Sequence, residues 1–166
     1  MKRFIVALMI CCGVAGLAKA DSYTSEQVAL ARICVSEAGW EIGDDCGSIL
    51  SVLRSRSERM RIPLMQAMRA YSSRTFDRSR TDSRRWIAEL SGNGFPRGLD
   101  AARYGGKWRQ LLDHAGELLA NPASTCDVHH WGSNHGNDLA RALRAGWTRV
   151  DCGDTKNAFW NMAREL

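Results

Sequence analysis

An apolar helix that ends on an acid is predicted at residues 30–40, which read LARICVSEAGW. Apolar residues recur there at helical spacing on more than one face, so the helix is expected to be buried on several sides. Glu37 falls on its last turn, where burial and the negative end of the helix dipole both disfavour a charged carboxylate. Both effects would raise the pKa of the Glu37 carboxyl towards that of a general acid. The alternative interpretation is that Glu37 only ends a core helix and takes no part in chemistry.

The first 20 residues have the pattern of a secretory signal peptide. Lys2 and Arg3 give a positive start, residues 4–17 are an apolar run that is short for a membrane span, and Ala18-Lys19-Ala20 is a small-x-small cleavage site. We therefore expect an exported protein, periplasmic or extracellular, with no stable membrane span after cleavage.

Residues 21–166 are expected to form one compact domain, since 146 residues can bury a real core. This part of the chain carries 20 basic and 18 acidic residues, because three of the 23 basic residues lie in the signal peptide. A net charge this small does not argue for binding to nucleic acid.

Four cysteines remain after the signal peptide, and an even number in an exported chain indicates two disulfides. We favour the local pairs Cys34–Cys46 and Cys126–Cys152 among the three possible connectivities. The first pair would clamp the turn that follows Glu37. A metal site is the alternative, although the chain has no Cys-x-x-Cys pair after residue 20.

Capping and periodicity signals predict a mainly α fold. Thr24 and Gln27 form a capping box, and Gly39 is the expected C-cap of the helix that ends near Glu37. Asp44 or Asp45 is expected to cap a second helix. Its predicted inner face holds Cys46, Ile49, Leu50, Leu53 and Met60, and its predicted solvated outer face holds Arg54, Arg56, Glu58 and Arg59.

Later elements are shorter, apart from one long amphipathic helix. Pro63 opens a third helix that reaches about Ala70, and Asp82 caps a further helix before a Gly/Pro turn region at residues 91–98. The long amphipathic helix spans Tyr104 to Ala120. After it we expect a short helix, a small β element and a terminal helix, at Asp138–Arg144, Trp147–Cys152 and the C-terminus respectively.

Two segments carry residues suited to binding a saccharide. The Tyr71–Arg80 segment is polar but holds Tyr71 and Phe76, so it is either a substrate-lining loop or an ordinary surface loop. The segment Cys126-Asp127-Val128-His129-His130-Trp131-Gly132-Ser133-Asn134-His135 places an aromatic ring beside polar donors, as a sugar subsite requires. Its alternatives are a metal site formed by Asp127 and the histidines, and a Trp131 that is simply buried.

The order of these motifs resembles the SleB-type cell-wall hydrolases, which are spore-cortex-lytic proteins of the lysozyme-like group. Glu37-Ala38-Gly39 corresponds to the family's Glu-Ala-(Arg)-Gly segment with one residue fewer. Ser55-Arg56 or Leu53-Arg54 stands near the family's asparagine-arginine pair, without the asparagine. His130-Trp131 and Asn157-Ala158-Phe159 stand near its late aromatic pair and closing His-x-Phe.

The resemblance implies a single lysozyme-like domain that cleaves the β-1,4 bond between N-acetylmuramic acid and N-acetylglucosamine in peptidoglycan glycan strands. Glu37 would be the catalytic acid. We favour a lytic transglycosylase, in which the same glutamate later acts as base; a hydrolase would need a second acid, for which Glu41, Asp44 and Asp45 are nearest in sequence.

The expected substrate-binding residues come from the same segments and their neighbours. They are Trp40, Tyr71, Phe76, His130, Trp131, Asn157 and Phe159. No cofactor and no metal are expected, and the protein is expected to be a monomer.

Two other functions stay open from the sequence. One is a metal-dependent peptidoglycan amidase or peptidase that uses His129, His130 or His135. The other is a non-enzymatic secreted binding protein, with Trp131 and the segment from Tyr71 to Phe76 as its contact surface.

Overall fold

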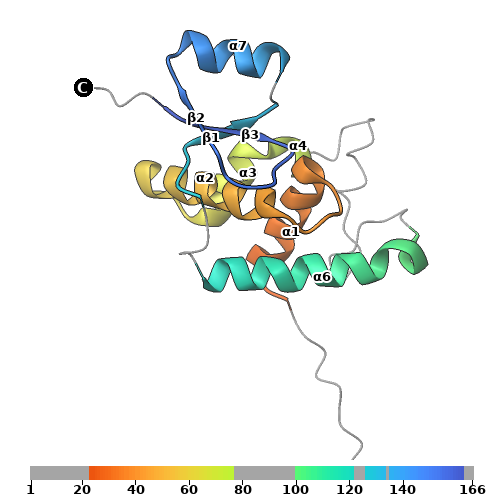
Figure 1. The fold of residues 1–166 in the computed structure, drawn as a ribbon. Helices are drawn as coiled ribbons and strands as arrows, with labels where there is room; N and C mark the ends of the chain where they lie inside the picture. Colours follow the sequence, from red (N-terminus) through yellow and green to blue (C-terminus); the bar gives the residue numbers. More distant parts are fainter. Residues whose placement is uncertain (1–22, 77–99, 122–125, 134, 163–166) are drawn as a thin grey trace, which may run out of the picture.

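The protein is mainly helical with a small antiparallel sheet, as the sequence predicted (Figure 1). The structure, a computed structural model, describes residues 23–76, 100–121, 126–133 and 135–162. The helices are α1 (Ser25–Ala38), α2 (Asp44–Met60), α3 (Leu64–Tyr71), α4 (Ser73–Phe76), α6 (Ala101–Ala120) and α7 (Gly136–Arg144). The strands are β1 (His130–Gly132), β2 (Thr148–Val150) and β3 (Ala158–Asn161). The predicted signal peptide, the helix expected after Asp82 and the turn at residues 91–98 lie outside the described residues.

Helix α1 begins and ends at the predicted residues. The Thr24 side chain accepts from the Gln27 backbone N–H, and the Gln27 side chain accepts from the Thr24 backbone N–H. Gly39 ends the helix with a φ of 95°, which favours glycine, and its N–H donates to the carbonyls of Cys34 and Val35.

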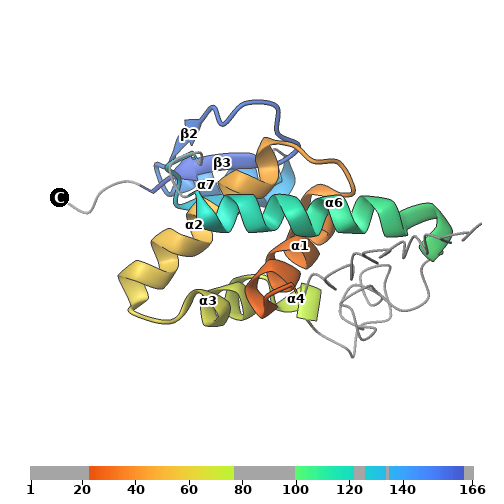
Figure 2. The same cartoon turned by 90° about the horizontal axis from the view of Figure 1, so that it is seen from below.

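The core is built around α1, which contacts α2, α3, α4 and α6. Helix α6 crosses α1 in two perpendicular views (Figures 1 and 2). It begins three residues before the predicted Tyr104, because the Asp100 side chain caps the backbone N–H groups of Ala102 and Arg103. Its inner face is apolar as predicted, with Trp108, Leu111, Leu112, Ala115 and Leu118 buried.

Helix α2 departs from its prediction at both ends. Gly43 is the N-cap, so Asp44 and Asp45 lie in the first turn, where their side chains bind another part of the chain. Met60 was expected on the inner face but is 53 % exposed, because the last turn of α2 is exposed beyond the core.

The Tyr71–Arg80 segment is partly helical rather than a loop. Tyr71 ends α3, and α4 follows at Ser73–Phe76; residues 77–80 lie outside the described part. Pro63 precedes the first residue of α3, where its fixed φ suits a helix start.

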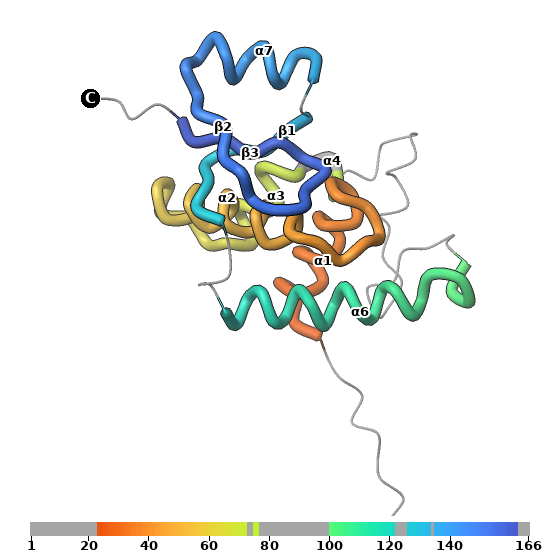
Figure 3. Tube along the Cα trace, in the orientation of Figure 1, coloured from red at the N-terminus to blue at the C-terminus, as the bar shows by residue number. Residues whose placement is uncertain are grey.

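The sheet region was predicted correctly only in part: the strand expected at Trp147–Cys152 is β2 and the helix expected at Asp138–Arg144 is α7, but β1 and β3 were not expected. Its strand order is β1-β3-β2, all antiparallel, so β3 is central and pairs on both edges. A terminal helix was expected near β3 and a loop at β1. Neighbouring side chains on a strand point to opposite faces, so Phe159 packs in the main core while Trp160 packs with Ala142 of α7. Figure 3 shows the strands running between α7 and the helical body.

Both predicted disulfides are present. Cys34–Cys46 joins the last turns of α1 to the first turn of α2, and Cys126–Cys152 joins the segment before β1 to the residues after β2. Two disulfides in one small domain are typical of proteins that fold outside the reducing cytosol. None of the described helices is long and apolar enough to cross a membrane.

Replacing Cys34 and Cys46 together by alanine should lower the free energy of unfolding by about 3 kcal/mol, because the bridge restricts the unfolded chain. Urea unfolding under oxidising conditions measures the loss. The matched double replacement at Cys126 and Cys152 should cost slightly more, since its sequence separation is 26 residues rather than 12. An unchanged midpoint for both variants would contradict the prediction.

Candidate active site

A pocket of about 390 Å³ lies where α1, α2 and the end of α3 meet the β1 strand. Its size is that of a small-ligand site. Five predicted site residues line it: Glu37, Tyr71, His130, Trp131 and Asn157. The same walls include Arg56, Ser72, Gly132, Ser133 and Asp138.

Glu37 reaches the pocket from the last turn of α1. The residue is half-buried, while its neighbours Ser36 and Ala38 are buried. Its backbone carbonyl accepts a hydrogen bond of 3.1 Å from Asn157 Nδ2. The end of α1 is thereby tied to the residues that lead into β3.

Asp45 holds the same residues from the side of α2. Its carboxylate is 5 % exposed and accepts three hydrogen bonds, from Lys156 N at 2.6 Å, Asn157 N at 2.9 Å and Asn157 Nδ2 at 2.9 Å. Bonds to a charged, buried acceptor are strong. The Asp45 carboxylate therefore fastens the β2–β3 connection to the helical body beside Glu37.

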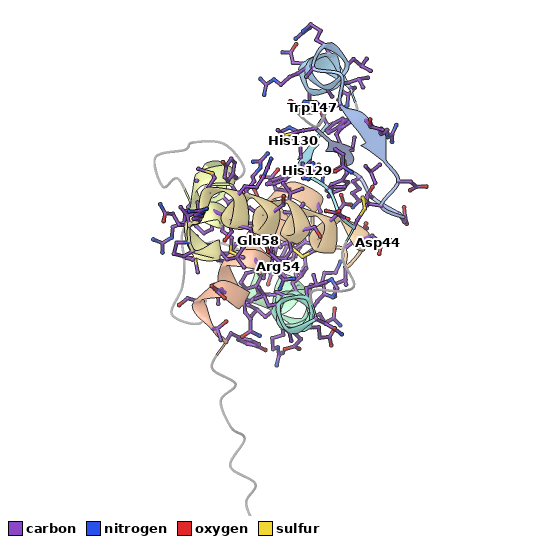
Figure 4. The ribbon with its side chains drawn as sticks, turned by 90° about the vertical axis from the view of Figure 1, so that its left-hand side faces the viewer. Asp44, Arg54, Glu58, His129, His130 and Trp147 are labelled. Carbon is purple, nitrogen blue, oxygen red and sulfur yellow. A yellow bond between two sulfur atoms is a disulfide. The ribbon has the colours of Figure 1, made fainter. Side chains whose placement is uncertain are left out.

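The other two acids of this turn also bind the β2–β3 connection. Asp44 Oδ2 accepts from Asp154 N at 3.1 Å, and Glu41 pairs with Lys156 at 2.7 Å on the exposed surface. The hydrogen bond and charge of Lys156 lower the pKa of Glu41, and Glu41 raises the pKa of Lys156. Figure 4 shows Asp44 at the start of α2. None of the three acids suggested for a second catalytic role lines the pocket.

The second carboxylate of the pocket is Asp138, in the first turn of α7. Its Oδ2 accepts from both the backbone N–H and the hydroxyl of Ser133, each at 3.0 Å. These bonds lower the pKa of Asp138, the backbone bond most, so the carboxylate stays ionised at neutral pH. The sequence marked Asp138 only as a helix start, because nothing local relates it to Glu37.

Arg56 was expected on a solvated face but is half-buried and lines the pocket. Its guanidinium lies 3.9 Å from the Tyr71 ring centre and 5.6 Å from that of Trp131. The signal that could have found it is helical spacing, since Arg56 follows buried Leu53 by three residues. Arg59, one turn on, is exposed as predicted, and Arg54 instead donates to the Leu118 and Leu119 carbonyls.

His130 is neutral at pH 7. Burial above all, and then the charge of Arg56, lower its pKa to about 4. Arg56 Nη2 donates to His130 Nδ1 at 2.8 Å, which leaves the ring hydrogen on Nε2. The ring also makes an edge contact with Trp147, 4.8 Å between centres; Figure 4 shows both residues above α2.

Three predicted substrate-binding residues lie outside this pocket. Trp40 packs against Tyr104, with ring centres 4.8 Å apart. Phe76 lies under the Arg32 guanidinium, and Phe159 is a core residue that is 1 % exposed. Phe159 therefore supports the sheet instead of presenting a surface to a ligand.

The histidines do not gather around one point. Within residues 23–76, 100–121, 126–133 and 135–162, no three His, Cys, Asp or Glu side chains could hold a metal ion together. His130 Nδ1 is bound by Arg56, and His135 is the exposed N-cap residue of α7.

Comparison of the chain with protein-family models, curated proteins and solved structures finds no match.

Asp45→Ala should lower the free energy of unfolding by about 3 kcal/mol, because it removes a buried carboxylate that accepts three hydrogen bonds from Lys156 and Asn157. Asp44→Ala is the matched control and should cost about 1 kcal/mol, since Asp44 is exposed and accepts a single backbone hydrogen bond, from Asp154. Chemical denaturation measures both. An equal loss of unfolding free energy in the two variants would contradict the prediction that Asp45 stabilises the fold more than Asp44 does.

Stability should fall as the pH drops from about 6.5 to about 4, because the unfolded chain then protonates His130 and the folded protein does not. His130→Gln keeps an acceptor for Arg56 but cannot titrate, so its melting temperature should depend less on pH over this range. The exposed His135→Gln is the control. Identical pH slopes for wild type and His130→Gln would contradict the assignment.

Proposed function

We propose that this protein is a glycosidase that cleaves peptidoglycan glycan strands, with Glu37 as the catalytic acid. The observation that carries the proposal is that Glu37 lines one pocket with Tyr71, His130, Trp131 and Asn157. An acid at the wall of a pocket with aromatic and hydrogen-bonding side chains suits a saccharide. The resemblance of Glu37-Ala38-Gly39 to the SleB-type segment supports the choice of substrate.

The chemistry begins with a proton. Protonated Glu37 donates it to the glycosidic oxygen, the bond from that oxygen to C1 of the muramic sugar breaks, and positive charge develops on the ring. The charge of ionised Asp138, in the same pocket, favours this oxocarbenium-like state. The Nε2–H of His130 is a donor for a sugar hydroxyl or acetamido oxygen.

The favoured outcome is transglycosylation. The 6-hydroxyl of the muramic sugar attacks C1 and gives its proton to the Glu37 carboxylate, which leaves a 1,6-anhydro product and restores the acid. Hydrolysis is the second candidate, because Asp138 offers a second carboxylate that could activate water. Either reaction requires a substrate outside the cytoplasm, in the periplasm or at the cell surface.

Glu37→Gln should reduce cleavage of purified peptidoglycan by about 10²- to 10⁴-fold, because the amide cannot donate the proton. Mass spectrometry of the digest should find anhydro-muropeptides with the wild type and none above background with the variant. Glu41→Gln is the control, since Glu41 is an exposed acid on the next turn and does not line the pocket.

Other products of the peptidoglycan digest would identify a different activity. Reducing-end sugars that depend on both Glu37 and Asp138 would identify a hydrolase. Free stem peptides would identify an amidase. Binding to peptidoglycan without any product would identify a binding protein.

A further inference from the structure

The positive charge of Arg56 lies in the pocket but takes no part in the proposed cleavage. Arg56 is a half-buried cation, and no carboxylate in the described part of the chain pairs with it. Its hydrogen bond goes to His130, which is neutral at pH 7. Burial without a counter-ion also lowers the pKa of Arg56, although an arginine stays charged.

Burying the Arg56 guanidinium costs desolvation free energy, and the contacts that it makes in the pocket offset only part of this cost. The rings of Tyr71 and Trp131 provide cation–π contacts, and His130 accepts from one guanidinium nitrogen, Nη2. An arginine has five N–H donors in a planar fork. Donors on the other guanidinium nitrogens are therefore left for a ligand, and an anion would supply the missing charge.

A second polar group in the same wall lacks a partner. The Ser72 hydroxyl is in a residue that is only 3 % exposed, lines the pocket and makes no hydrogen bond within the described residues. Ser72 follows Tyr71, whose ring lies against the Arg56 guanidinium. An acceptor oxygen bound near Arg56 would satisfy a buried donor that otherwise costs stability.

We propose that Arg56, supported by Ser72, is a subsite for a carboxylate on the substrate, so that the protein selects acidic glycans over neutral ones. The planar guanidinium fork matches a carboxylate, and a monoanion is favoured over a phosphate because Glu37 and Asp138 line the same pocket. For the identity of the glycan the inference rests on the proposed function. The carboxylate has two possible sources, the lactyl group of a muramic sugar and the stem peptide.

The test is equilibrium binding by calorimetry, with Glu37→Gln as the parent protein so that no ligand is cleaved. Four ligands of equal glycan length separate the sources. They are strands with free lactyl carboxylates, strands with stem peptides, strands with lactyl methylamides, and neutral chitin oligosaccharides. The parent protein should bind either the strands with free lactyl carboxylates or the strands with stem peptides about ten- to a hundredfold more tightly than the methylamide strands. Whichever of the two binds more tightly identifies the source of the carboxylate.

Substitutions then assign the preference. Adding Arg56→Gln should bring the ratio of the affinities for the carboxylate-bearing and methylamide strands close to one, and Arg56→Lys should retain part of the preference. Arg59→Gln removes the same charge from an exposed site on the same helix and should change nothing. Melting temperatures verify that each variant is folded.

The proposal is overturned if the parent protein binds both carboxylate-bearing strands, with free lactyl groups and with stem peptides, no more tightly than the methylamide strands. This comparison needs no variant at Arg56. An equal loss for charged and neutral ligands in a folded Arg56→Gln protein would also overturn it, since that is the effect of a structural residue. A carboxylate preference without glycan cleavage by the wild type would uphold the subsite and refute the glycosidase.

Discussion

The Asp45 carboxylate is the point on which the arrangement of the site depends. It is buried at the start of α2 and accepts hydrogen bonds from Lys156 and Asn157, at the entrance to the central strand β3. The Asn157 amide also donates to the Glu37 carbonyl. One carboxylate thus links both central helices to the sheet, and the sheet carries His130 and Trp131 to the pocket.

The two disulfides and the apolar core also hold the helices and the sheet together. Cys34–Cys46 holds α1 against α2 around the turn after Glu37, and Cys126–Cys152 joins the approach to β1 with the end of β2. Phe159 packs the sheet onto the helical core. The pocket walls are therefore held by covalent bonds, burial and charged hydrogen bonds together, which makes the pocket a preformed surface.

The electrostatics of the pocket follow from this packing. Ionised Asp138 and the cation of Arg56 line the same space, while His130 is kept neutral between them by burial and by the arginine. Ionised Asp138, and a guanidinium that pairs with no carboxylate of the described residues, would suit a ligand that carries both a developing positive charge and an acid group. The proposed glycan strand has both properties.

Local signals in the sequence were sufficient for the helical framework. The Thr24 and Gln27 capping box, the Gly39 C-cap, the apolar face of α6 and the pairing of the nearby cysteines each depend on residues close together in the chain, so short-range physics decides them. The central strand β3 and the pocket residues Arg56 and Asp138 did not follow from such signals. An apolar run such as Ala158–Asn161 suits a strand or a buried helix equally, and only its two pairing partners decide between them. The same holds for Arg56 and Asp138: whether a charge faces water or a pocket depends on what packs against it, and those neighbours come from distant parts of the chain.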